Sequence, residues 1–118
     1  MIRYGRFLAP LLWLTAFVVY VLAVLPGGEG AQLFAWDKLN HAAAFLVLAI
    51  LAVVAHPRVS ILRIGLALSA FGGFIELTQM IPALHRDASF DDWFADICAI
   101  AIGLLLMLPF RRAVADTA

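Results

Sequence analysis

Apolar residues form four long runs along the chain, separated by short polar stretches. The runs cover residues 7–25, 39–55, 61–81 and 92–108. A proline follows each run within two residues, and proline is a common signal for the end of a helix. A helix needs about 20 mostly apolar residues to cross the hydrocarbon core of a bilayer. The pattern therefore predicts four transmembrane helices.

Composition favours the same fold class. Of the 118 residues, 65% are hydrophobic and 14% are charged, and the mean hydropathy is +1.03. Soluble domains have roughly 45–50% apolar and about 25% charged residues, and so short a chain has too much surface to bury this many apolar side chains in water. A disordered segment or a nucleic-acid-binding domain would carry more charge. We therefore expect residues 1–118 to form a single all-α domain, a bundle of four transmembrane helices with short loops.

The first apolar run could also belong to a secretory signal peptide, because Arg3 and Arg6 precede it. Against this interpretation, the run is longer than the apolar region of such peptides and contains Trp13 and Tyr20. The Pro–Gly sequence that follows also makes a poor cleavage site. We therefore interpret this run as a retained first transmembrane helix.

The formal net charge is zero, but the charges are unevenly distributed. In a four-helix arrangement one side of the membrane receives six of the eight basic residues, Arg3, Arg6, Arg58, Arg63, Arg111 and Arg112. The other side and its helix ends receive seven of the eight acidic residues, Glu29, Asp37, Glu76, Asp87, Asp91, Asp92 and Asp96. Because Lys and Arg concentrate in cytoplasmic loops, we expect both termini in the cytoplasm and the loops at 26–38 and 82–91 outside.

Three of the predicted helices carry an ionisable residue near the outer end, namely His41, Glu76 and Asp96. Such residues are rare in spanning helices and usually face the bundle interior or an aqueous cavity. Glu76 lies near the end of its helix, where the helix dipole and burial both disfavour an anion. It must therefore be protonated or have a cationic partner such as His41, Lys38 or Arg86. Asp96 lies too deep for helix capping to explain it.

Helical spacing groups these residues with others, because positions i, i+3 and i+4 share one face. The predicted polar pocket comprises the residues grouped in this way, Asp37, His41, Glu76, Gln79, Asp92 and Asp96, together with the candidate cationic partners Lys38 and Arg86 and the loop residue Ser89. Small residues that let membrane helices approach closely continue two of the faces inward, at Gly65, Ser69, Gly72, Ala99 and Gly103. We therefore expect helices 61–81 and 92–108 to meet through these faces. The alternative role for Ser89 and Asp92 is helix capping. The alternative explanation for the small-residue faces is chance, because these helices are rich in Ala and Gly.

The sequence contains no familiar catalytic or zinc-binding motif. It lacks C-x-x-C, H-E-x-x-H and G-x-S-x-G, and no Cys/His cluster has zinc-site spacing. The single cysteine, Cys98, excludes an intrachain disulfide, and its small apolar neighbours predict a packed, inert thiol. We therefore expect no cofactor and no metal, and we assign no catalytic residue.

Three polar motifs occur in a fixed order along the chain. They are Asp37-Lys38-x-x-His41 followed by Phe45, then Glu76-x-x-Gln79, then Arg86-x-x-Ser89-x-x-Asp92-x-x-x-Asp96 followed by Gly103. In this order and spacing the chain resembles the VanZ-like family of small bacterial membrane proteins. The family often has Asn at the position of Asp96 and Gly at that of Ala99, so an amide role at position 96 would not transfer unchanged. The resemblance implies a multi-pass protein of the bacterial inner membrane, linked in some members to reduced sensitivity to teicoplanin-type glycopeptide antibiotics.

Several functions are compatible with this pattern. We favour a non-enzymatic envelope protein whose outward-facing pocket binds a lipid headgroup, a cell-wall precursor or a partner protein. One alternative is a membrane-embedded hydrolase of a lipid-linked substrate, which would use acid/base or metal-assisted chemistry. Others are a small proton-coupled carrier, and a polar cluster that only holds the helices together. The lipid bilayer is the expected partner, nucleic acid is not, and the sequence does not define the oligomeric state.

Overall fold

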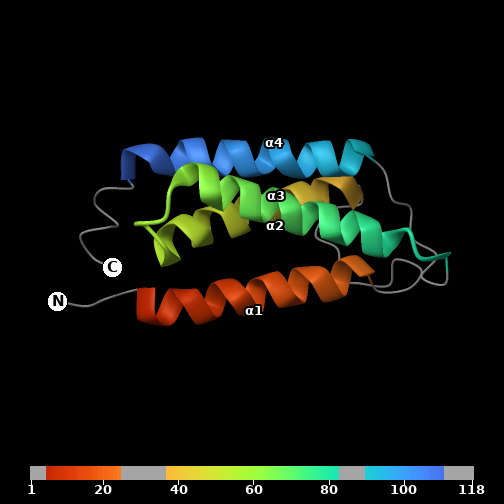
Figure 1. Cartoon of the computed structure of the whole chain (residues 1–118), viewed down its shortest axis with the longest axis horizontal. Coiled ribbons are helices and arrows are strands. Elements are labelled where there is room, and N and C mark those ends of the chain that lie inside the picture. Colours follow the sequence, from red (N-terminus) through yellow and green to blue (C-terminus); the bar gives the residue numbers. More distant parts are fainter. Residues whose placement is uncertain (1–4, 25–36, 83–89, 111–118) are drawn as a thin grey trace.

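The computed structural model describes residues 5–24, 37–82 and 90–110, and the regular structure within these ranges is helical. Its elements are α1 (Gly5–Val24), α2 (Asp37–Ala55), α3 (Ile61–Gln79), α4 (Phe90–Met107) and a short 3-10 helix, η3 (Leu108–Phe110). Each boundary of the four long helices lies within two residues of the position expected from hydropathy. Consecutive helices run antiparallel, so the start of α1, the α2–α3 turn and the end of α4 lie at one end of the bundle (Figure 1).

Three segments in the described part of the chain are long and apolar enough to cross a membrane, residues 7–24, 61–79 and 90–110. The apolar stretch of α2 is shorter, covering the 17 residues Leu39–Ala55. Large apolar side chains also cover the outer surface, with Phe7 and Trp13 70% exposed and Phe90 79% exposed. Soluble monomers rarely expose apolar surface on this scale, whereas a bilayer covers it. The chain is therefore an all-helical membrane protein.

Helix α2 supplies the centre of the core and packs most extensively against α4. Its Phe45, Leu48, Ala49 and Val53 are fully buried. The closest approach to α4 is at Gly103, where an added Cβ would lie 2.8 Å from the Cβ of Ala49. The sequence predicts that Gly103 packs against α3. This prediction is wrong, because Gly103 faces α2.

The small residues of α3 face α4. A Cβ on Gly65 would lie 3.3 Å from Leu104 Cδ1. One turn further along, the indole Nε1 of Trp93 donates a hydrogen bond of 3.0 Å to the backbone oxygen of Ser69. A buried glycine, Gly72, continues this face of α3 towards the other end of the bundle. Helices α3 and α4 thus meet along the face that the α3 spacing predicts.

Polar contacts attach the last turns of α1 to α3. Gln79 Nε2 donates a 2.8 Å hydrogen bond to the oxygen of Ala23, one of the terminal carbonyls of α1 that have no partner within their own helix. The hydroxyls of Tyr20 and Thr78 lie 3.1 Å apart. Because Thr78 uses its only proton to donate to the oxygen of Phe74 at 3.0 Å, Tyr20 is the donor in this pair. These bonds hold α1 near the end of the bundle where α3 ends.

Cys98 is exposed on α4, so the prediction of a packed thiol is wrong. Its neighbours Ala99 and Ile100 are buried and direct that face of α4 to the core. In a membrane protein, positions that face lipid are as apolar as positions that face the core. Apolar sequence neighbours therefore do not establish burial.

Candidate functional site

His41, Glu76 and Asp96 come together from three different helices, α2, α3 and α4. One ligand atom from each side chain, an imidazole nitrogen or a carboxylate oxygen, lies within 4.8 Å of the other two. The three residues are buried, with exposed fractions of 8%, 6% and 0%. We call them the triad. The sequence places these residues near one plane, and the structure joins them into one cluster.

The antiparallel order of the helices explains this convergence. His41 lies just after the start of α2, Glu76 just before the end of α3, and Asp96 in the second turn of α4. Each is therefore one to two turns inside its helix, at the end of the bundle opposite the α2–α3 turn (Figure 1). A shift of one residue in any of the three helices would turn its side chain about 100° away from the cluster.

A glycine makes room for the deepest member of the triad. A Cβ on Gly72 would lie 3.4 Å from Asp96 Oδ2 and 3.4 Å from the ring of Phe45. Both distances are at the short edge of ordinary van der Waals contact, so a larger side chain would displace the carboxylate or the ring. Gly72 thus allows α3 to pass close to the Asp96 carboxylate.

Two carboxylates at this separation strongly influence each other. If both were ionised, a distance of at most 4.8 Å between their nearest oxygens and an effective dielectric constant of about 20 would give a repulsion of at least about 3.5 kcal/mol. The imidazole of His41 lies within the same distance and can supply a positive charge or a hydrogen-bond donor. A shared proton or a bound cation would also relieve the repulsion. The triad is therefore a group whose charge state depends on what it binds.

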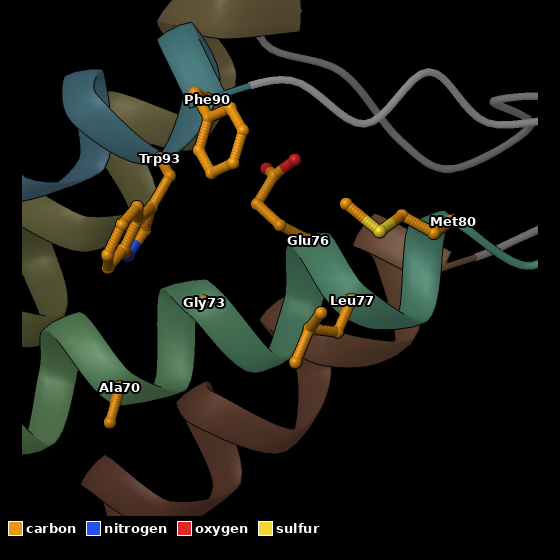
Figure 2. Close-up of a pocket in the computed structure, with 7 residues that line it drawn as sticks. All are labelled: Ala70, Gly73, Glu76, Leu77, Met80, Phe90 and Trp93. Atoms are coloured by element: carbon orange, nitrogen blue, oxygen red, sulfur yellow. The ribbon is translucent and has the colours of Figure 1, made fainter.

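A pocket of about 410 Å³ lies beside the triad, between α3 and the first turn of α4. Among the residues that the structure describes, its lining comprises Ala70, Gly73, Glu76, Leu77, Met80, Phe90 and Trp93. Figure 2 shows the carboxylate of Glu76 directed from α3 towards Phe90, with Met80 on one side. Among these lining residues Glu76 alone is ionisable, and the others are apolar or aromatic. Glu76 thus belongs both to the triad and to the wall of the pocket.

The other predicted pocket residues have different positions. Gln79 is 2% exposed, and its amide nitrogen binds Ala23 of α1. Asp92 is half-buried in the first turn of α4, next to the exposed Asp91. The side chains of Asp37 and Lys38, and the whole of Arg86 and Ser89, lie outside the described residues.

Trp93 is the site residue that the sequence analysis missed, since tryptophan near a helix end is typical of interfacial anchoring. In the structure it lines the pocket, and its indole bonds to α3 at Ser69. The signal that could have identified it is its spacing, because it lies three residues before Asp96 and thus near the same face of α4.

Comparisons with protein-family models, with curated proteins and with solved structures give no match for this chain. Its fold and site together define a helical membrane protein with a buried His–Glu–Asp cluster beside an apolar pocket.

Proposed function

We propose that the chain is a four-span protein of the bacterial inner membrane, related to the VanZ-like family, whose pocket binds the polar head of an envelope amphiphile. The ligand class comprises membrane lipids and lipid-linked cell-wall precursors. The observation that carries the proposal is the pocket of about 410 Å³ in whose described lining a single buried carboxylate, that of Glu76, lies among apolar and aromatic residues. Ligand sites typically combine mostly apolar walls with a few placed polar groups.

Helix lengths and surface charges support the topology. The 17-residue apolar stretch of α2 is within the range of about 17–25 residues found for spanning helices. Arg58 and Arg63 are exposed at the α2–α3 turn, the end where α1 begins and α4 ends. The exposed Asp91 lies at the opposite end, in the first turn of α4. By the positive-inside rule the arginine end faces the cytoplasm, so the triad and the pocket lie towards the outside.

The shape of the pocket favours an amphiphile over a fully polar ligand. A polar head at Glu76 could interact with the triad, while an acyl or prenyl chain would contact Phe90, Trp93 and Met80. Phe90 and Met80 are 79% and 57% exposed, so the pocket is open towards the surrounding membrane. A ligand could then enter from the bilayer without leaving it.

A pocket-filling substitution tests the proposal. Ala70 is an exposed lining residue, so Ala70→Phe should occupy the pocket without disturbing the core. The matched control is Ala101→Phe, the same change at an exposed position of α4 outside the pocket lining. Each protein is purified in mild detergent, and bound lipid is quantified by native mass spectrometry. We expect at least about a tenfold loss for Ala70→Phe and none for the control; equal retention by the two variants would disprove the proposal.

The charge of Glu76 is tested separately, because Glu76→Gln preserves the shape of the pocket. Hydrogen bonds to a charged group contribute about 1.5–3 kcal/mol, so binding of the head group should weaken by roughly 10- to 100-fold. The resemblance adds a cellular readout: if the chain lowers sensitivity to teicoplanin when expressed, Glu76→Gln should abolish this effect. Full activity of that variant would argue against a role for the carboxylate.

A second candidate is a hydrolase acting on a lipid-linked substrate. The specific observation is that one imidazole and two carboxylates meet beside the pocket, and these groups suffice for general acid–base catalysis. Purified protein would be incubated with undecaprenyl-linked substrates, with and without divalent metal ions. Turnover that is lost in His41→Gln would establish this activity, and no turnover in either condition would eliminate it.

A further inference from the structure

The triad supplies the donor atoms of a metal site. His41 offers an imidazole nitrogen, and Glu76 and Asp96 offer carboxylate oxygens, all within 4.8 Å of one another. Three atoms at such separations share a point no more than about 2.8 Å from each, whereas zinc binds such ligands at about 2.0–2.2 Å. Side-chain rotations that move each ligand atom by about 0.7 Å would therefore bring all three atoms to bonding distance.

We propose that His41, Glu76 and Asp96 bind one divalent transition-metal ion of the Zn²⁺ class. Two carboxylates and a divalent cation are together neutral, which suits a cluster whose members are at most 8% exposed in a membrane protein. One nitrogen and two oxygens are ligands that zinc and its first-row neighbours accept. The three donors come from three helices, so the ion would also link α2, α3 and α4.

The position of Glu76 connects the ion to the pocket. Zinc sites with three protein ligands keep a fourth position for water or substrate. Glu76 belongs to the triad and also lines the pocket shown in Figure 2, so that fourth position would be accessible from the pocket. The inference rests on the proposed function and deepens it, since a bound cation would select amphiphiles with a phosphate or another anionic head group.

Metal titration of the full chain tests the inference. The protein is purified in detergent and stripped with EDTA, and Co²⁺ is added while its visible d–d absorption is recorded. We expect one Co²⁺ per chain, displaced by Zn²⁺ and not by Mg²⁺, and affinity at least about 100-fold lower in His41→Gln and Glu76→Gln. The matched controls are His56→Gln and Asp91→Asn, a half-buried histidine and an exposed carboxylate outside the triad, and both should bind Co²⁺ as the wild type does.

A second measurement does not depend on the folding of any variant. An ion that binds the folded chain raises its unfolding temperature in proportion to the logarithm of the ion concentration. We expect Zn²⁺ to stabilise the wild-type chain in this way. The inference is overturned if the wild type binds no Co²⁺ and gains no stability, which would indicate a shared proton or a cationic side chain at the triad. It is also overturned if both triad variants bind Co²⁺ normally.

The inference and the proposed function can fail independently. Lipid retention by Ala70→Phe and Ala101→Phe is therefore compared on EDTA-stripped protein as well. If stripped protein still distinguishes these variants but binds no Co²⁺, the metal site is refuted and the lipid pocket stands. If Co²⁺ binds at the triad but Ala70→Phe retains lipid normally, the lipid pocket is refuted.

Discussion

A methyl group added at Gly103 should separate α2 from α4. In Gly103→Ala the new Cβ would lie 2.8 Å from the Cβ of Ala49, 3.2 Å from the backbone oxygen of Leu46 and 3.3 Å from its Cδ1. The preferred separation of two carbon atoms is about 3.5–4.0 Å, so the helices must move apart by up to about 1 Å. Rotating a side chain cannot relieve this clash, because a Cβ and a backbone oxygen are fixed to their helices.

The size of the effect follows from two opposing terms. Overpacking a well-packed core costs about 1–3 kcal/mol, whereas Ala is favoured over Gly within a helix by about 1 kcal/mol. We therefore expect Gly103→Ala to lower the free energy of unfolding by up to about 2 kcal/mol. Since α2 carries His41 and α4 carries Asp96, the same separation should weaken ion binding at the triad.

Unfolding by SDS in mixed micelles, followed by far-UV circular dichroism, measures this effect. The control is Gly65→Ala, where the nearest atom is the flexible end of Leu104 at 3.3 Å, so the stability should stay the same or rise. In the double variant Ala49→Gly/Gly103→Ala the closest contact is removed, and a double-mutant cycle should show a favourable coupling of at least about 0.5 kcal/mol. The reasoning would be refuted if Gly103→Ala matched Gly65→Ala in stability, or if the coupling were absent.

Three further predictions concern side-chain hydrogen bonds and topology. Trp93→Phe removes the hydrogen-bond donor to the backbone oxygen of Ser69 and part of the pocket wall. It should lower the free energy of unfolding by about 1–2 kcal/mol in the same assay. An unchanged free energy of unfolding would mean that this bond does not hold α3 to α4. Tyr20→Phe keeps the ring stacked on Phe74, with the ring centroids 5.6 Å apart, but loses the hydrogen bond to Thr78. It should lower the free energy of unfolding by only about 0.6 kcal/mol, the average for such bonds in membranes; a larger loss would show that the hydroxyl stabilises the fold through more than this one bond. For topology, a reporter that fluoresces only in the cytoplasm should fluoresce when fused to the C-terminus, whereas an alkaline phosphatase fusion at the same position should be inactive. The reverse result would show that the orientation is opposite to the one proposed.

Much of the fold could be predicted from the sequence because the membrane requires long apolar helices with well-defined ends. Hydropathy and prolines are sufficient to locate α1 to α4. The antiparallel order that follows from short loops then brings the start of α2, the end of α3 and the start of α4 together. This is why the meeting of His41, Glu76 and Asp96 could be anticipated from their depth alone.

The neighbour of each helix face could not be predicted in the same way. Helical periodicity shows that Gly103 and Asp96 lie near one face of α4, but two helices pack against that helix, and Gly103 contacts α2 while Asp96 also adjoins α3 at Gly72. Gln79 shares a face with Glu76, yet its amide reaches back to Ala23 of α1. Such choices depend on the rotation and tilt of whole helices, which packing sets and a single sequence does not encode locally.

Among the described residues, two hydrogen bonds join α1 to α3, and both lie in the last turns of α1. These bonds involve Tyr20 and Ala23, whereas the middle of α1 borders a pocket of about 380 Å³ lined in part by Leu12, Trp13 and Ala16. Helices adapt to a thinner or thicker bilayer by tilting, at modest cost. We therefore expect α1 to change its tilt about this hydrogen-bonded end more readily than α2, α3 and α4 change their mutual positions. Such a tilt would leave the geometry of the triad unchanged when membrane thickness varies, because the triad lies on α2, α3 and α4 and α1 contributes no residue to it.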